Sequence, residues 1–250
     1  MYKRIIIKIS GEMLGNEQSP FSDAAINRLA GEIKAISETG TEVSFVVGGG
    51  NFWRGRSAPQ GMNNVVADQI GMTATIMNGL YFSDALRRIG VRSVVMTPFE
   101  VNGFTEKFSL HAANKYLQEK TVIIFAGGSG HPFFSTDIVL AFRAQELEVD
   151  AVLFAKNIDG IYNADPNKDK TARKYKTINY DTVISNGLEF ADISAICILN
   201  NSRSSIPSVV FEANIPKGLI IASKGDSGIF DIGGTKVNKN VEEEFYEYRH

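Results

Sequence analysis

The stretch TEVSFVVGGGNFWRG, residues 41–55, joins a run of apolar residues to three consecutive glycines. Val43 to Val47 is typical of a buried strand, because the run is short, apolar and followed by a turn signal. Glycines at the carboxyl end of a strand let the backbone approach a ligand closely, since they carry no Cβ atom. A flexible turn would contain the same glycines, but Arg54 adds a planar donor fork that suits phosphate. The stretch therefore favours a strand that ends at a phosphate-binding loop.

On both sides of this stretch, short β-branched runs alternate with longer amphipathic ones. The apolar spacing predicts a helix over 24–39, capped by Ser22 or Asp23, and a longer one over 64–89 that could break near Gly79. A further helix is expected over 137–147. Strands are expected at 4–9, 93–96, 122–126, 151–154 and 208–211, and around Ile229. This alternation indicates an α/β fold with a mostly parallel sheet and helices on both faces.

The chain has 250 residues, of which 44% are hydrophobic, enough for one large core or for two lobes that share a sheet. No Pro/Ser-rich linker interrupts it. We therefore expect a single domain over 1–237, with an N-terminal lobe of about 1–150 and a C-terminal lobe of about 151–237. The polar tail over 238–250 is expected to be poorly ordered.

Charge is nearly balanced, with 26 Lys and Arg against 28 Asp and Glu, so no basic field suits a nucleic acid or an anionic membrane. The single cysteine, Cys197, excludes an intramolecular disulfide and is expected to be a buried thiol. No apolar run approaches the length of a membrane helix. We expect a soluble cytoplasmic protein without nucleic-acid or membrane partners.

Several common nucleotide-binding signatures are absent from the sequence. There is no G-x-x-x-x-G-K-[ST], no G-x-G-x-x-G and no protein-kinase motif set. Spacings of Cys and His that would hold a metal are also missing, so no residue is assigned as a direct metal ligand.

A second candidate loop follows the first strand, in KISGE, residues 8–12. Lys8 would point from the strand end into the crevice where α/β sheets bind ligands, and would supply a point charge to a phosphoryl group. Gly11 permits a tight turn whose N–H groups could meet phosphate oxygens. The alternative is a surface lysine after an edge strand.

A third loop, AGGSGHPFFSTD, covers residues 126–137 and leads from a strand into a helix. Its Ser135, Thr136 or Asp137 could cap that helix or face a ligand. The paired phenylalanines could pack beside a base or fill the core. His131 is interpreted as a bystander to catalysis.

A fourth motif, KNIDGIYNADP, covers residues 156–166 and contains two turn signals, so it predicts a loop or hairpin. Tyr162 could stack on an adenine, and Asp165 could accept from a ribose or amino group. Three glycine-rich strand ends with Lys8 and Arg54 are what phosphoryl transfer requires, because that reaction depends on positioning and charge neutralisation.

These residues resemble the bacterial-type UMP kinases (uridylate kinases) of the amino-acid kinase superfamily. The resemblance runs from Tyr2 to Phe211 and rests on the strings KISGE, VVGGGNFWRG, GMNNVVADQIGMTATIMNGL, GHPFFSTD and NIDGIYNADP, in that order. It implies a three-layer α/β/α sandwich, a homohexamer, GTP or UTP as effector, and the reaction ATP + UMP → ADP + UDP with Mg²⁺. It also makes the N-terminal lobe the UMP side and the C-terminal lobe the ATP side.

Carried over position by position, the resemblance assigns three groups of residues. The reacting centre would contain Lys8, Arg54, Asp137 and Asp192. ATP would be bound by Lys8, Ile9, Ser10, Gly11, Gly50, Arg54, Lys156, Asn157, Tyr162 and Asp165. UMP would be bound by Gly49, Asp68, Ser129, Gly130, His131, Pro132, Phe133, Phe134, Ser135 and Thr136.

The sequence departs from the family at three places: His131 replaces the usual Asn, the loop after Gly15 lacks the glycine-rich segment linked to GTP, and the chain after Phe211 is longer. Two alternatives remain: a related kinase that acts on a carboxylate or carbamate, and a non-catalytic relative. The acidic side chains and Lys8 favour catalysis over the second.

Overall fold

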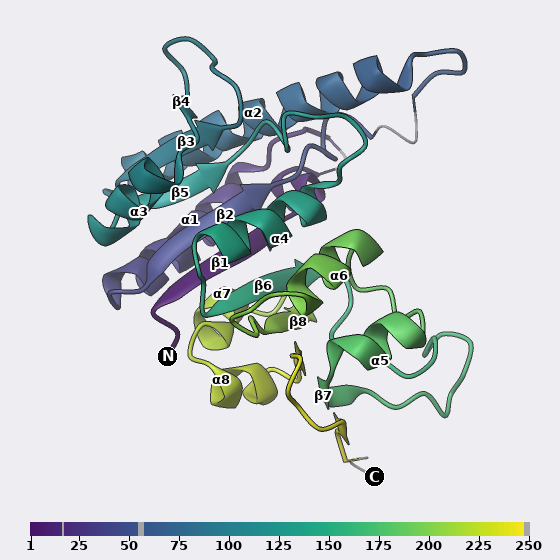
Figure 1. Ribbon diagram of the computed structural model, residues 1–250. Coiled ribbons are helices and arrows are strands. Elements are labelled where there is room, and N and C mark those ends of the chain that lie inside the picture. The colour runs from purple at the N-terminus through teal and green to yellow at the C-terminus, as the bar shows by residue number, and fades with distance from the viewer. Residues whose placement is uncertain (17, 55–57, 248–250) are drawn as a thin grey trace. The chain divides into compact units, whose positions relative to one another are not determined.

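The computed structural model describes residues 1–16, 18–54 and 58–247. The chain divides into two compact units, each described here by itself. Ile6–Leu140 forms the N-terminal unit, purple to teal in Figure 1, and Met1–Ile5 with Ala141–His250 forms the C-terminal unit.

The strands of the N-terminal unit follow the order β1-β2-β5-β3-β4. Their bounds are β1 Arg4–Ile9, β2 Glu42–Val47, β3 Ser93–Thr97, β4 Glu106–Lys107 and β5 Val122–Phe125. β5 pairs in parallel with both β2 and β3, and β3 pairs in parallel with β4. Parallel strands need crossover connections, which the helices between them supply.

The helices of this unit are η1 Gly11–Leu14, α1 Asp23–Glu38, α2 Asn64–Arg88, α3 Leu110–Gln118 and the first turns of α4 Thr136–Glu146. Of the two predicted caps of α1, Ser22 is the one that accepts from the N–H of Ala25. The apolar side of α1 is buried as its spacing predicts, and Phe45 of β2 meets Phe82 of α2 edge to face. Hydrophobic burial between sheet and helices therefore holds the unit together.

The helix α2 runs unbroken from Asn64 to Arg88, so the predicted break near Gly79 is wrong. A Cβ atom at Gly79 would lie 3.1 Å from that of Ala126 and 3.2 Å from Cγ1 of Val95. The glycine lets the helix lie close against the sheet.

The strands of the C-terminal unit follow the order β10-β7-β9-β8-β6. Their bounds are β6 Ala151–Lys156, β7 Tyr175–Ile178, β8 Ser208–Glu212, β9 Thr235–Val237 and β10 Glu244–Phe245. The pairs β6–β8 and β7–β9 are parallel, whereas β8–β9 and β7–β10 are antiparallel. The accompanying helices are α5 Tyr180–Ser185, α6 Ile193–Asn200, α7 Gly218–Ala222 and α8 Asp226–Asp231. The predicted fold class, a mostly parallel sheet flanked by helices, is confirmed.

Three local expectations are wrong in the C-terminal unit. The segment around Ile229 is the helix α8, and the strand comes later, at Thr235–Val237. The tail is partly ordered, because Phe245 of β10 stacks on Tyr175 with ring centroids 4.2 Å apart. Cys197 is half-buried, because the buried face of α6 carries Ala195, Ile196 and Leu199 instead.

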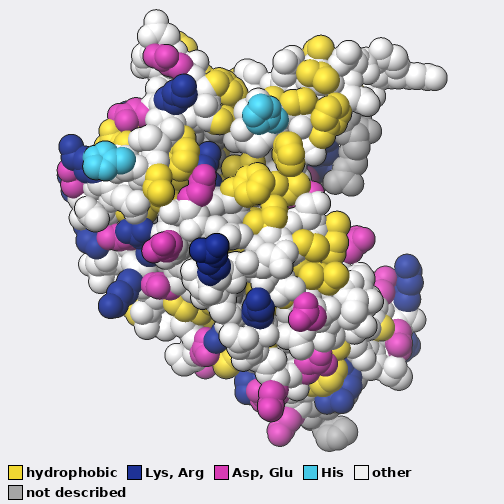
Figure 2. Space-filling view, in the orientation of Figure 1, with side chains coloured by type: hydrophobic (Ala, Val, Ile, Leu, Met, Phe, Trp, Pro, Cys, Tyr) yellow, Lys and Arg dark blue, Asp and Glu magenta, His cyan; other side chains and the backbone are white. Residues whose placement is uncertain are grey.

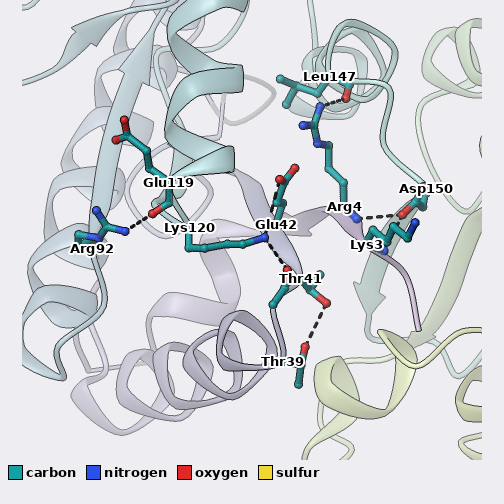
Figure 3. Close-up of polar contacts among 11 residues, drawn as sticks. Lys3, Arg4, Thr39, Thr41, Glu42, Arg92, Glu119, Lys120, Leu147 and Asp150 are labelled. Carbon is teal, nitrogen blue, oxygen red and sulfur yellow. Dashed lines mark hydrogen bonds and ion pairs between the residues drawn. The ribbon is translucent and has the colours of Figure 1, made fainter.

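Polar contacts fix the chain before the strands in each unit (Figure 3). In the N-terminal unit, Lys120 donates to the carbonyl of Gly40 at 2.7 Å, and Arg92 donates to the carbonyl of Glu119. In the C-terminal unit, the Asp150 carboxylate accepts from the N–H groups of Lys3 and Arg4, at 2.6 and 2.9 Å.

Acidic and basic side chains are intermixed on the face drawn in Figure 2, as the balanced composition predicts. Within the described part of the chain, every helix is too short or too polar to cross a membrane.

Candidate active site

Lys8, near the carboxyl end of β1, forms an ion pair with Asp137 in the first turn of α4. The ammonium nitrogen lies 2.8 Å from Oδ1 of the carboxylate, and the two side chains are 9% and 14% exposed. The start of a helix favours a negative charge, so α4 stabilises Asp137 there. A lysine so little exposed can act strongly on an anion placed beside it, because little water screens it.

The loops after β1 and β2 touch each other through their glycines. A Cβ atom at Gly11 would come within 2.5 Å of the amide nitrogen of Gly50 and 2.6 Å of Oδ1 of Asn51. The N–H of Gly48 donates to the carbonyl of Ile9 at 2.8 Å. The two loops can approach each other this closely only because Gly11 carries no side chain.

The loop after β2 is held from below by Asn78 of α2, which is fully buried. Its amide donates to the carbonyl of Gly48 and to Oδ1 of Asn51, each at 2.7 Å, and accepts from Asn51 at 2.9 Å. Neither asparagine was predicted from the sequence to have a role. A signal for Asn78 was available, because it lies four positions after Ala74 and four before Phe82. It is therefore a polar residue on the apolar face of a helix.

Arg54 pairs with Glu12, with Nη2 and Oε1 2.7 Å apart, and both side chains are about half exposed. A Cβ atom at Gly50 would lie 3.4 Å from the same carboxylate oxygen. An exposed pair of this kind contributes little stability, so the guanidinium can change partners at small cost.

Ile9 and Ser10, also predicted to bind ATP, differ in exposure. Ile9 is fully buried, so only its backbone can face a ligand. Ser10 precedes η1 without capping it through its side chain.

A pocket of about 140 Å³ lies in the N-terminal unit among the residues predicted for UMP. Of those, Gly49, Asp68, His131, Phe134 and Thr136 line it. The other lining residues were not predicted from the sequence; they are Trp53, Ala67, Gly71, Met72, Thr75 and Gly128. Four of these six come from α2, where their helical spacing alone did not distinguish a pocket wall from the core.

Asp68 is hydrogen-bonded to the loop that forms one wall of this pocket. Its Oδ2 accepts from the N–H of Phe133 at 2.8 Å. Phe133 has a φ of 70° and is 70% exposed, so a bulky residue occupies left-handed backbone without packing into the core. Strain of this kind persists where the surroundings impose it, and is common around ligands.

The remaining loop residues predicted to bind UMP do not line the pocket, and their described contacts are with nearby residues. The Ser129 hydroxyl donates to the carbonyl of His131 and accepts from its N–H. Ser135 accepts from the N–H of Ile138, so it is the predicted cap of α4. Gly130 has a φ of 81° and packs near Pro98, and Pro132 is half-buried.

A second pocket, of about 850 Å³, lies within the C-terminal unit. Three predicted ATP residues line it: Asn157, Tyr162 and Asp165. Its other walls, which were not predicted, include Ile158, Ile161, Leu188, Phe190 and Glu212. Pockets of this size with an apolar lining and a few polar groups are typical of small-molecule sites.

Lys156 does not line this pocket, and its ammonium lies 5.7 Å from the ring centroid of Phe154. Asp165 accepts from the N–H of Asn167 at 3.0 Å. That backbone hydrogen bond, followed by the Asn167 amide and nearby Lys168, lowers the pKa of Asp165. The carboxylate is thus kept ionised, as an acceptor of hydroxyl protons must be.

Tyr162 is fixed at the pocket wall by Asp159, which it reaches at 3.1 and 3.2 Å. Desolvation, and then the negative charge of Asp159, raise the pKa of Tyr162 to about 12. The phenol therefore stays neutral at physiological pH.

Asp192 caps α6, where its Oδ1 accepts from the N–H of Ser194 at 2.8 Å. Among the described residues, no three His, Cys, Asp or Glu side chains converge on a point that could hold a metal ion.

Comparison with known proteins decides the family. The model of the amino acid kinase family matches residues 3–212. The chain belongs to this family. It is similar to the crystal structure of UMP kinase from Ureaplasma parvum, with 33% identity, a TM-score of 0.86, and 96% of this chain and 100% of that one covered.

UMP kinase from Bacillus anthracis is 32% identical with a TM-score of 0.87, covering 98% of this amino acid kinase and 99% of that chain. Uridylate kinase from Archaeoglobus fulgidus, at 24% identity and a TM-score of 0.68, covers 93% of this chain and 99% of its own and supports the fold. The resemblance to bacterial UMP kinases that the motifs indicated is thus confirmed.

Proposed function

We propose that this amino acid kinase transfers the γ-phosphate of ATP to UMP, giving ADP and UDP for pyrimidine nucleotide synthesis. The observation that carries the proposal is the Lys8–Asp137 pair, little exposed and set beside loops whose glycines touch. The similarity to two UMP kinases over nearly the whole chain supports UMP as the acceptor.

On the acceptor side, UMP would bind at the pocket that Asp68, His131 and Thr136 line. Asp68 has a carboxylate oxygen beyond the one that holds Phe133, and ribose hydroxyls are suitable donors to it. The start of α4 would attract the UMP phosphate, because free N–H groups and the helix dipole favour an anion there. The segment from Ser129 to Thr136 would wrap the nucleotide.

On the donor side, we assign adenosine to the 850 Å³ pocket with Asn157, Tyr162 and Asp165. The ATP phosphates would meet the backbone of Ile9–Gly11 and Gly50, with Lys8 and Arg54 as the charged donors. Lys156 is the weaker candidate, because Asn157 lines the pocket and Lys156 does not.

The mechanism that follows is direct in-line transfer. The second pKa of a phosphate monoester is about 6, so the UMP oxygen is already ionised at neutral pH and needs no general base. Lys8 would stabilise charge on the transferring group, and Asp137 would aim it. Mg²⁺, carried by ATP, would neutralise the phosphate oxygens when bound. By the family resemblance, Asp192 at the start of α6 would also act at the reacting centre.

We further propose that the chain assembles with copies of itself as a homohexamer, responds to GTP or UTP, and works in the cytoplasm. Self-association is supported by an apolar groove of about 300 Å³ along α2, where Val66, Ile70 and Met77 are each more than a third exposed. Light scattering of the purified protein measures this directly, and a monomer would refute it.

The experiment that tests the reaction is ADP release from ATP and Mg²⁺ with UMP, CMP, acetylglutamate or aspartate as the acceptor. We expect release with UMP far above that with the other three. Release with a carboxylate substrate instead would assign the chain to a different kinase, and no release with any acceptor would favour a non-catalytic relative.

A further inference from the structure

The end of the chain is fastened to the C-terminal unit by a strap, which we define as residues 242–246. Its Glu244 and Phe245 form β10 against β7. The Thr177 hydroxyl donates to the carbonyl of Glu242 at 2.6 Å, and the N–H of Tyr246 donates to the carbonyl of Lys174 at 3.0 Å. The strap is therefore held along its whole length.

Side chains add to this attachment. The Phe245 ring stacks on Tyr175, and the guanidinium of Arg173 lies 4.2 Å from the centroid of the Phe245 ring. Glu244 pairs with Lys176 at 2.7 Å. Aromatic stacking, a cation–π contact and an ion pair thus follow one another along the same β7 edge.

Tyr246 connects the strap to a half-buried lysine, Lys174. Its hydroxyl donates to the carbonyl of Gly234 at 2.6 Å, which fixes the ring. The ammonium of Lys174 lies 5.1 Å from the centroid of that ring and 2.8 Å from Oδ2 of Asp159. The lysine side chain is 19% exposed, so both neighbours act on it with limited screening.

Asp159 connects Lys174 to the wall of the large pocket. Its carboxylate accepts from Tyr162, and both residues line the 850 Å³ pocket. The hairpin that carries Tyr162 also bridges to Lys174 through its backbone. Tyr246, Lys174, Asp159 and Tyr162 therefore form one continuous series of contacts from the strap to the pocket wall.

We propose that Tyr246 is a positioning residue for this nucleotide pocket, acting through Lys174 and Asp159 on Tyr162. The inference rests on the proposed function only in taking ATP as the occupant. The aromatic ring that holds Lys174 is the part that matters. Loss of the ring leaves Lys174 freer to move, and the wall that carries Tyr162 loosens with it.

The first test needs no nucleotide: amide hydrogen exchange of the full-length chain. In Tyr246→Leu we expect residues 159–163 to exchange about two- to fivefold faster, the scale of one cation–π contact. Tyr246→Phe keeps the ring and should exchange almost as the wild type does. Glu243→Gln is the matched control, because Glu243 contacts Thr182 and Asn179, away from this series.

The second test is steady-state kinetics with ATP and UMP. Tyr246→Leu should raise KM for ATP by about two- to fivefold, with KM for UMP and kcat nearly unchanged. Lys174→Met breaks the series one contact later and should loosen the same residues, which keeps the test available if Tyr246→Leu folds poorly.

Unchanged exchange at 159–163 in a folded Tyr246→Leu protein would overturn the inference, as would equal changes in KM for both substrates. A wild-type protein that releases no ADP with UMP would refute the proposed reaction instead, and the exchange experiment would still decide the role of Tyr246.

Discussion

Replacing Lys8 by Met removes the ammonium group but keeps most of the apolar stem, so packing under the loops is retained. If Lys8 stabilises charge on the transferring phosphoryl group, kcat should fall by about 10²–10³, as for the loss of one preorganised donor. The same change removes the ammonium group that lies 2.8 Å from the carboxylate of Asp137, a side chain only 14% exposed. Breaking a buried pair in this way should lower the free energy of unfolding by about 3 kcal/mol.

The double variant Lys8→Met/Asp137→Asn separates these two effects. Its uncharged amide no longer needs a cation, so urea unfolding should recover most of the lost stability, while kcat, measured by UMP-dependent ADP release, should stay low. Two results would refute the reasoning: near-normal turnover in folded Lys8→Met, or activity that returns together with stability in the double variant.

Four further changes test other parts of the site. Asp68→Asn should weaken UMP binding in calorimetric titration more than ATP binding, and equal losses would remove Asp68 from the UMP site. Gly11→Ala forces a Cβ atom to 2.5 Å from the backbone of Gly50, so KM for ATP should rise at least tenfold, and wild-type kinetics would contradict the close approach of the two loops. Asn78→Ala leaves the Gly48 carbonyl without its amide donor and should lower stability to urea by about 1–3 kcal/mol, whereas an unchanged midpoint would show that the pair is dispensable. Burial raises the pKa of Tyr246 to about 12 from 10.0, so the unfolded chain loses this proton first and stability should fall between pH 10 and 12. Tyr246→Phe should make that fall in stability less steep in urea titrations at different pH. An identical fall in the variant would show that other groups cause it.

The sequence predicted those features that depend on local pattern. The strand before Gly48 and the glycine loop after it are adjacent in the chain, so apolar composition and glycine chemistry were sufficient. The acceptor substrate could not be predicted in this way. Composition and spacing indicated only phosphate chemistry, and UMP was implied by the family resemblance.

What could not be predicted depends on contacts between distant segments. Gly79 looked like a helix breaker because its packing partner, Ala126, lies just after β5, far along the chain. Ile229 looked like part of a strand because a helix of six residues, such as α8, is too short to show its period. Tyr246 looked like part of a free tail because its partners precede it by at least 12 residues.

The reciprocal hydrogen bonds of Asn51 and Asn78 also limit how these two positions can vary. Each amide satisfies the other, so a change at either one leaves a polar group stranded beneath the loop. A mutational screen that scores only product formation would rank Asn78 with the catalytic residues, although it lies fully buried below the loop. Scoring folded protein beside activity would return it to its place as scaffold, and viable replacements should appear as pairs.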